Sequence, residues 1–492
     1  MKSSVAAIAI VSVAAALFAV FPLTDTDIWW HLACAREWVT TWTPVRTPVV
    51  NVHVIFQQVV AFVYNMGGAP LLVAAKSVLW GLVFLQFLGA ANAKEKCKSD
   101  GSSFFSWIAV VLLFVFRYQF EIRPVVFSLL FLGVYWNALP IIFEAKELAW
   151  WKKLLLALLI LVIQWLWCKC QGLFILGPIF ALVVLVNSLD RRCVGQKKLI
   201  LYGFFVALLF GMPFLHKEGL LLAIYPFELL NRLVGLSPSG TIFAKEIAEN
   251  RSPLSLLMSG ENMLTSVGML LVILTSFAYS TACLVRNFIR KNFASRQLIL
   301  PEVLLALAVL ALTAERNFVL LMPVFLIALR DGCNMLCTGK HLQLGAKVIA
   351  VLVLAFVVGL WCRSLLAYDK TMISFQRVPV AAAEWMKNHP HGGRLFNDDR
   401  AGGYLAFVNP QDPTFIDGRF ILKTADFFER YLNYASAPES FLQDASLMNV
   451  DRAVFPLRYY ARWQRLLRTL VATPGWHLSY KDSYFVVFDC DN

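Results

Sequence analysis

Residues 24–36 read TDTDIWWHLACAR, and they follow directly on the apolar run Val5–Leu23. The stretch places ionisable and aromatic side chains just past the end of a predicted membrane helix, namely Asp25, Asp27, Trp29, Trp30, His31 and Arg36. Tryptophan favours the membrane–water boundary, because its ring is apolar and its N–H needs a partner. A carboxylate at that depth is costly unless it serves a site or a partner. Two interpretations follow: an aromatic belt with helix-capping aspartates, or a substrate or metal site at the outer membrane face.

The composition excludes an ordinary soluble protein. Hydrophobic residues make up 59% of the 492 residues and charged residues only 15%, and several apolar runs are long enough to span a bilayer. The net charge of +13 lies entirely before Tyr368, because the remainder of the chain holds 14 basic and 14 acidic residues. An excess of basic residues confined to the membrane part indicates positive-inside loops and argues against nucleic-acid binding.

Eleven apolar segments are predicted to cross the membrane, although some are shorter than the ~20 residues that a spanning helix needs. They are Val5–Leu23, Leu71–Ala91, Phe104–Phe116, Val125–Phe143, Leu154–Trp167, Leu173–Leu189, Ile200–Leu215, Met263–Val285, Leu298–Thr313, Asn317–Leu329 and Val348–Leu366. The loops then assigned to the cytoplasm carry clusters of lysine and arginine, within residues 94–98, 146–153, 191–198, 286–296 and 330–347. This pattern predicts a cytoplasmic N-terminus and an extracytoplasmic C-terminal domain.

Ionisable residues gather on the connections assigned to the outer face. Besides the first outer loop, residues 24–70, these connections carry Glu121, Arg123, Lys169, Glu315 and Arg316. Lys76 lies about one turn inside the second span, where it either snorkels to the interface or meets an anionic group in a cavity. The basic residues suit phosphate or pyrophosphate binding. Structural ion pairs are the alternative, for example Glu121 with Arg123 and Glu315 with Arg316.

The chain changes character at Tyr368. We therefore predict a transmembrane bundle over residues 1–367 and an outer α/β domain over residues 368–492. The expected helices are Val380–His389, Gly402–Val408, Ala425–Ala435, Glu439–Met448 and Tyr459–Val471, and the expected strands are Arg394–Asn397, Thr414–Asp417, Ala453–Pro456, His477–Tyr480 and Tyr484–Phe488. The pairs Gly402-Gly403 and Asp417-Gly418 predict turns, and Arg419 either reaches a lipid phosphate or pairs with Asp417.

Two carboxylates two residues apart, Asp25 and Asp27, can bind a hard divalent cation such as Mg²⁺ or Mn²⁺, or one of them can act as a general base. The neighbouring aromatic rings can stack on a sugar or on an isoprene unit. The ten cysteines form no zinc-ligand pattern and no disulfide framework.

Several short motifs resemble the GT-C superfamily of polytopic membrane glycosyltransferases, which use polyprenyl-phosphate-linked sugars. The run Asp27–Leu32 is similar to the first-outer-loop motif of oligosaccharyltransferase catalytic subunits. A little-characterised group of bacterial members is similar at more positions: Arg123–Ser128, Trp167–Gly177, Glu249–Pro253, Arg316-Asn317, Gly392–Tyr404 and Phe415–Arg419. The chain departs from that group at His53–Phe56 and Trp167–Gln171, which lack its Glu, Asn and His.

The resemblance implies a GT-C-like helical bundle with an outer α/β domain in a bacterial inner membrane. It implies an enzyme of the cell envelope that transfers a sugar from a polyprenyl-phosphate-linked donor to a glycan, lipid or protein acceptor at the outer face. Asp27 and Asp25 would be catalytic, and Asp27, Glu121 and Glu315 would hold a metal. Substrate would be bound by Trp29, Trp30, His31, Arg36, Lys76, Arg123, Lys169, Arg316 and Arg419. A non-catalytic protein that binds lipid-linked glycan or a partner, and a transporter or flippase, are the alternatives.

Overall fold

The structure is a computed structural model, and it describes residues 2–92, 101–144, 148–188, 196–290, 296–336, 340–458 and 461–491. The chain divides into two compact units. One comprises Met1–Val20 and Ala74–Tyr368, and the other comprises Phe21–Val73 and Asp369–Asn492. The second unit therefore joins the whole of the predicted first outer loop to the C-terminal part of the chain.

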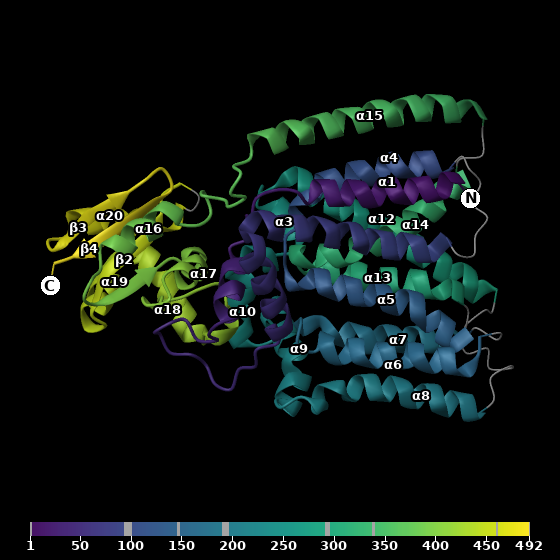
Figure 1. Cartoon of the computed structure of the whole chain (residues 1–492), viewed down its shortest axis with the longest axis horizontal. Helices are drawn as coiled ribbons and strands as arrows, with labels where there is room; N and C mark the ends of the chain where they lie inside the picture. Colours follow the sequence, from purple (N-terminus) through teal and green to yellow (C-terminus); the bar gives the residue numbers. More distant parts are fainter. Residues whose placement is uncertain are drawn as a thin grey trace. The chain divides into compact units, whose positions relative to one another are not determined.

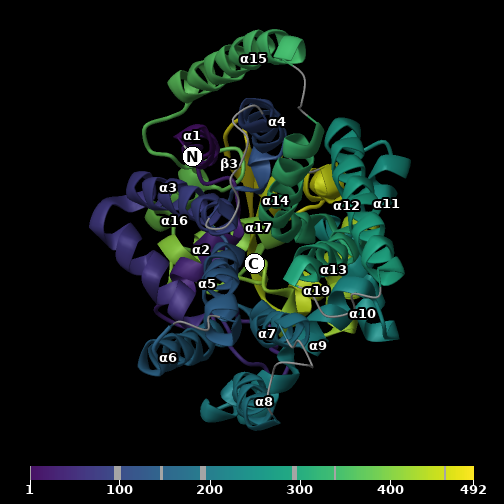
Figure 2. The same cartoon turned by 90° about the vertical axis from the view of Figure 1, so that its right-hand side faces the viewer.

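The first unit is a bundle of apolar helices that run side by side (Figure 1). α1 (Lys2–Phe18) packs against α4 (Gly101–Val115), and α4 also contacts α14 (Phe318–Leu336) and α15 (Lys340–Ala367). Figure 2 shows the bundle from one end, with α12, α13 and α14 close together. The remaining long helices are α5 (Pro124–Glu144), α6 (Trp150–Trp167), α7 (Leu176–Ser188), α8 (Gln196–Gly211), α12 (Met263–Ile289) and α13 (Ile299–Thr313).

Each of the eleven predicted spans falls on a helix, but the number of membrane crossings is a separate question. Five helices are long and apolar enough to cross: Val54–Gly89, Pro124–Phe143, Trp150–Trp167, Lys197–Leu215 and Met263–Ile289. A sixth candidate is the pair α9 (Gly219–Val234) and α10 (Pro238–Glu246), which is bent by 62°. These helices make the chain a multi-pass membrane protein, and eleven crossings remains a prediction.

The helix pattern differs from the sequence prediction at two places. Residues 216–262, which connect the predicted spans Ile200–Leu215 and Met263–Val285, contain α9, α10 and the short α11 (Pro253–Met258). The second predicted span belongs to a longer helix, α3 (Val54–Asn92), whose backbone breaks at Gly67 and Gly68. Gly68 has φ +65°, a conformation that glycine adopts without the steric cost of a side chain.

The second unit is built on a four-stranded mixed sheet in the order β1-β2-β4-β3. β1 (Arg394–Asn397) runs parallel to β2 (Val450–Pro456), while β4 (Phe485–Cys490) is antiparallel to β2 and to β3 (Trp476–Lys481). Every residue of β2 is buried, as expected for a central strand covered on both faces.

Helices cover both faces of this sheet (Figure 1). Trp463 packs on Phe455 at 5.3 Å between ring centroids, and Trp385 of α16 (Val380–Asn388) lies 5.2 Å from the guanidinium of Arg452. Positions 452 and 455 of β2 point to opposite faces because strand side chains alternate. The other helices are α17 (Asp399–Val408), α18 (Ala425–Ser436), α19 (Pro438–Leu447) and α20 (Gln464–Ala472).

The predicted strand Thr414–Asp417 is wrong. Thr414 forms only an isolated bridge with Thr41, from the first outer loop. The next residues are held by a side chain, because Asn397 Oδ1 accepts from the N–H of Phe415 at 2.8 Å and Asn397 Nδ2 donates to the carbonyl of Ile416 at 2.7 Å. An asparagine side chain thus takes the place of a neighbouring strand.

Candidate functional site

The predicted catalytic carboxylates lie at the start of a short helix, α2 (Asp27–Cys34), in the second unit. The backbone N–H of Asp27 donates to Asp25 Oδ1 at 3.2 Å, so Asp25, which is 7% exposed, supports the first turn. Asp27 is itself the first residue of the helix and is partly exposed. A helix N-terminus favours a negative charge, which stabilises the ionised form of a carboxylate at this position.

Two glycines of the C-terminal part lie against this first turn. A Cβ added at Gly418 would come 2.3 Å from Asp27 Oδ1 and 3.3 Å from Trp30 Nε1. A Cβ added at Gly403, in α17, would come 2.9 Å from the backbone nitrogen of Trp30. The carboxylate of Asp27 therefore occupies space that exists only because position 418 has no side chain.

The aromatic residues of α2 are core residues of this unit. Trp29 is fully buried and its ring centroid lies 4.8 Å from that of Tyr404 and 6.0 Å from that of Tyr64. Trp30 is 7% exposed, and its ring centroid lies 3.5 Å from that of His31. The indole N–H groups of both tryptophans lack a hydrogen-bond acceptor among the residues that the structure describes. The motif thus anchors α2 through packing, and substrate stacking by these rings remains a prediction.

Arg419 is buried beside this carboxylate region, next in sequence to Gly418. Its guanidinium donates to both oxygens of Asp417, to Thr40 Oγ1 at 2.6 Å and to the carbonyl of Trp38. Burial alone would raise the pKa of the Asp417 carboxyl, but the charge and hydrogen bonds of Arg419 hold that pKa below its usual value. Of the two roles predicted for Arg419, the ion pair with Asp417 is the one that the geometry shows.

A second buried cation, Lys423, forms hydrogen bonds with residues 41–44 of the first outer loop. Lys423 Nζ donates to Thr43 Oγ1 at 2.6 Å, to Thr41 Oγ1 at 3.2 Å and to the carbonyl of Pro44 at 3.1 Å. Burial lowers the pKa of Lys423 to about 8. Arg36, by contrast, is exposed and lies 5.0 Å from the ring of Phe407.

In the first unit, acidic and basic residues of the predicted outer connections form ion pairs. Lys76 is fully buried and its ammonium lies 3.8 Å from a carboxylate oxygen of Glu121. Lys76 therefore does not snorkel to solvent; it faces an anionic group, the second of the two alternatives predicted for it. The observed partners of the other cations come from distant segments: Arg123 makes a bidentate pair with Glu249 at 2.6 and 2.7 Å, and Lys169 pairs with Glu218 at 2.7 Å.

The turn at Glu315 contacts two distant segments of the first unit, which contain Tyr118 and Arg251. Tyr118 Oη donates to Glu315 Oε1 at 3.1 Å, and the backbone N–H of Glu315 donates to the carbonyl of Arg251 at 2.9 Å. Burial raises the pKa of Glu315. Arg316 lies in the same short turn, Glu315–Asn317, and is half-buried.

The predicted metal ligands are divided between the two units. Asp27 belongs to the second unit, and Glu121 and Glu315 belong to the first. Within the described ranges, no group of three or more His, Cys, Asp or Glu side chains could hold a metal ion. Asp25 and Asp27 supply two carboxylates by themselves, so metal binding remains a prediction.

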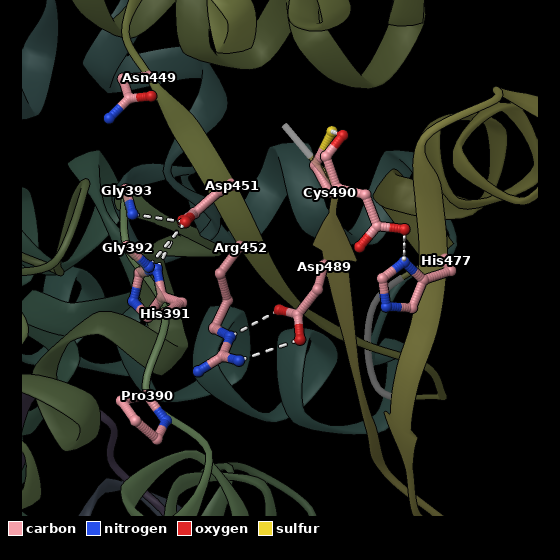
Figure 3. Close-up of a pocket in the computed structure, with 11 residues that line it drawn as sticks. Pro390, His391, Gly392, Gly393, Asn449, Asp451, Arg452, His477, Asp489 and Cys490 are labelled. Atoms are coloured by element: carbon pink, nitrogen blue, oxygen red, sulfur yellow. Dashed lines mark hydrogen bonds and ion pairs between the residues drawn. The ribbon is translucent and has the colours of Figure 1, made fainter.

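A polar cleft of about 600 Å³ opens at the start of β1 and β2 (Figure 3). It is lined by Pro390–Gly393, Asn449, Asp451, Arg452, His477 and Asp489–Asp491. These residues come from four separate segments, so no local sequence pattern identifies them. Sequence reasoning missed this cleft, and the Pro-His-Gly-Gly turn before a predicted strand was the one available signal.

Comparisons with known proteins concern the fold. No family model matches the chain, and no curated protein matches it. The archaeal oligosaccharyltransferase AglB from Archaeoglobus fulgidus, in complex with an inhibitory peptide and a dolichol-phosphate, is similar with a TM-score of 0.57 and 12% identity, over 98% of this chain and 74% of that chain. The A. fulgidus enzyme in complex with Zn and sulfate gives 0.56 and 12%, over 99% and 73%.

A second enzyme is similar over nearly its whole length. ArnT from Cupriavidus metallidurans, bound to undecaprenyl phosphate, has a TM-score of 0.52 and 12% identity, over 99% of this chain and 97% of that chain. AglB and ArnT are both GT-C glycosyltransferases. The chain therefore has the fold of these two enzymes, which confirms the predicted GT-C-like fold.

Proposed function

We propose that this protein transfers a sugar from a polyprenyl-phosphate-linked donor to an acceptor at the outer face of a bacterial inner membrane. The observation that supports the proposal most is the placement of Asp27: a carboxylate at a helix N-terminus, packed against Gly418 in a chain with the GT-C fold. The solved relatives were captured with dolichol-phosphate and with undecaprenyl phosphate, which supports a lipid phosphate as the leaving group.

Asp27 would act as the general base. Its carboxylate would accept the proton of the acceptor's attacking group while that group forms a bond to the anomeric carbon and the lipid phosphate leaves, which inverts the configuration. A helix N-terminus favours a negative charge, and the buried Asp417–Arg419 pair holds Gly418 in place beside the carboxylate.

The donor phosphate would be bound by cations that are already paired but accessible. The side chain of Arg123 is 28% exposed and that of its partner Glu249 is 44% exposed, and the corresponding values for Lys169 and Glu218 are 15% and 29%. A phosphate can replace a carboxylate in such pairs because guanidinium and ammonium groups bind both. A Mg²⁺ or Mn²⁺ ion held by Asp27 would neutralise phosphate charge.

A non-catalytic role is the second candidate, and it too has an observation in its favour. Trp29, Trp30 and His31 are buried, and Arg419 is occupied by Asp417, so most of the side chains expected to bind substrate near Asp27 serve the fold here. Such a protein would bind a lipid-linked glycan without transferring it.

Sugar transfer in membranes that carry Asp27→Asn tests the choice. Asparagine keeps the size and removes the negative charge, so a lost base should cost at least about 100-fold in rate. Asp25→Asn is the matched control, because Asp25 accepts the N–H of Asp27 and should affect stability by about 1 kcal/mol.

A further inference from the structure

His391 occupies the turn between α16 and β1, and both of its ring nitrogens face carboxylates. Nδ1 lies 2.5 Å from Asp451 Oδ1, and Nε2 lies 3.1 Å from Asp412 Oδ2. A neutral imidazole has one N–H and one lone pair. An ionised carboxylate only accepts hydrogen bonds. With both aspartates ionised, both contacts can therefore be hydrogen bonds at the same time only when the ring carries two protons and a positive charge.

The carboxylate of Asp451 is fixed by the backbone. It accepts the N–H of Gly392 at 3.0 Å and also the N–H of Gly393 (Figure 3). A Cβ at Gly393 would come 2.6 Å from Asp451 Cγ. The turn and the start of β2 thus form a rigid seat for the imidazole, and Asp412 is the partner that lies on a loop.

The two facing aspartates, and not the other charged groups of the cleft, favour the protonated imidazole. Asp489, from β4, is paired with Arg452 of β2 at 2.6 and 2.9 Å, so these two opposite charges offset each other. The remaining titratable groups that line the cleft are His477, Cys490 and Asp491, of which His477 lies 3.4 Å from Asp491. Burial lowers the pKa of His391, but the hydrogen bonds and charges of Asp412 and Asp451 outweigh burial and raise that pKa above its usual value.

The loop held by His391 leads directly to the segment beside Asp27. Asp412 lies in the turn after α17, where its N–H donates to the carbonyl of Asn409 at 3.1 Å. Two residues later, the N–H of Thr414 donates to the carbonyl of Thr40 at 3.1 Å. Gly418 then packs against the carboxylate of Asp27. One end of the segment 412–419 is thus tied to His391, and the other end borders the candidate site.

We propose that His391 is a proton-dependent clamp for the segment 412–419. As an imidazolium it links Asp412 to Asp451 and fixes the start of the segment. As a neutral ring it keeps only one of the two hydrogen bonds, so the segment opens more often. Since the folded-state pKa lies above the unfolded value, this stabilisation is complete below the unfolded pKa of about 6.5 and is lost as the pH rises through the folded pKa.

Hydrogen exchange of the full-length protein in lipid nanodiscs tests the clamp between about pH 5.5 and about pH 8.5, the range in which histidine titrates. After correction for intrinsic exchange, protection of a peptide covering 409–419 should fall at least about tenfold with rising pH, the scale of a charged hydrogen bond. In His391→Gln, protection should be low and independent of pH. His477→Gln is the matched control, because His477 lies in the same cleft but half-exposed, with Asp491 as its ion-pair partner, and it should behave as wild type.

Asp412→Asn provides a second variant that leaves the seat of the imidazole intact. It should abolish the pH dependence while a peptide from α18 remains protected. The clamp would be disproved by wild-type protection that does not change with pH, or by a pH dependence that survives in His391→Gln or in Asp412→Asn. Loss of the effect in His477→Gln would equally overturn the assignment to His391. None of these outcomes depends on sugar transfer, so the experiment tests the clamp separately from the proposed activity.

Discussion

Replacing Arg419 with methionine removes one partner of a fully buried ion pair. The side chains of Arg419 and Asp417 are 1% and 2% exposed, so the variant leaves a carboxylate buried without its counter-charge. Breaking such a pair costs about 3–5 kcal/mol. Because every 1.4 kcal/mol is a factor of ten, opening of this segment should become roughly 150- to 4,000-fold more frequent.

Arg430→Met is the matched control, because it removes an arginine of the same unit from a pair whose cation lies at the surface. The side chain of Arg430 is 66% exposed, and its partner Asp444 is 6% exposed but also accepts a hydrogen bond from Tyr434. Loss of this solvent-screened cation should therefore cost less than loss of the buried Arg419. Hydrogen exchange of a peptide covering 414–424 measures both variants. Equal losses in the two variants would refute the argument that burial sets the energy of the Asp417–Arg419 pair.

Arg419→Met should also reverse the sign of the pH effect of Asp417 on stability. In the wild type the pKa of Asp417 is lowered, so its contribution is present above the unfolded pKa of about 3.9 and is lost as the pH falls through the folded pKa. Without Arg419, burial dominates and raises that pKa, so protonation relieves the buried charge. The gap in stability between variant and wild type should narrow from about pH 7 to about pH 5, and a constant gap would contradict this reasoning.

Three further predictions concern other parts of the chain. Gly418→Ala should move the Asp27 carboxylate and lower any transfer activity, with little loss of stability because the new Cβ clashes only with the end of a side chain. Gly402→Ala is the contrasting variant: its Cβ would lie 1.8 Å from a backbone oxygen, so it should destabilise the domain in a thermal melt. Burial lowers the pKa of Lys423 to about 8, so between about pH 8 and about pH 10.5 the unfolded chain binds this proton more strongly than the folded chain. The free energy of unfolding of the second unit should therefore rise over that range, and Lys423→Met should remove the rise. Protease added to intact spheroplasts should cleave the domain after Tyr368, and protection of that domain until lysis would overturn the orientation predicted from the basic loops.

Much of the helical fold was predictable because membrane helices carry long apolar runs. The runs near residues 263–285 and 125–143, for example, became α12 and α5 with small shifts of their ends. Length and composition do not decide how many helices cross, however, since α13 spans only Ile299–Thr313. The bent pair α9 and α10 lies outside the predicted spans, because Pro226 interrupts the apolar run of α9 and Gly235 and Pro238 separate that run from α10.

The candidate site was predictable only in part, because its geometry depends on contacts between distant residues. The short motif marked Asp27, but nothing near position 27 indicates that Gly418 would border its carboxylate. Phe415 and Ile416 are of types that favour strands, yet Asn397 provides their hydrogen bonds. Conversely, Trp29 reads as an interfacial anchor and is a buried core residue, since α17 and the start of α3 cover it.

In the proposed mechanism the carboxylate of Asp27 carries the chemistry. Single-turnover transfer of a radiolabelled sugar from a polyprenyl-phosphate donor tests this role, in membranes that contain wild type, Asp27→Asn or Asp25→Asn at matched protein level. We predict a loss of at least about 100-fold for Asp27→Asn and a much smaller loss for Asp25→Asn. Transfer by Asp27→Asn at the wild-type rate would contradict the catalytic assignment and favour a protein that only binds the lipid-linked sugar.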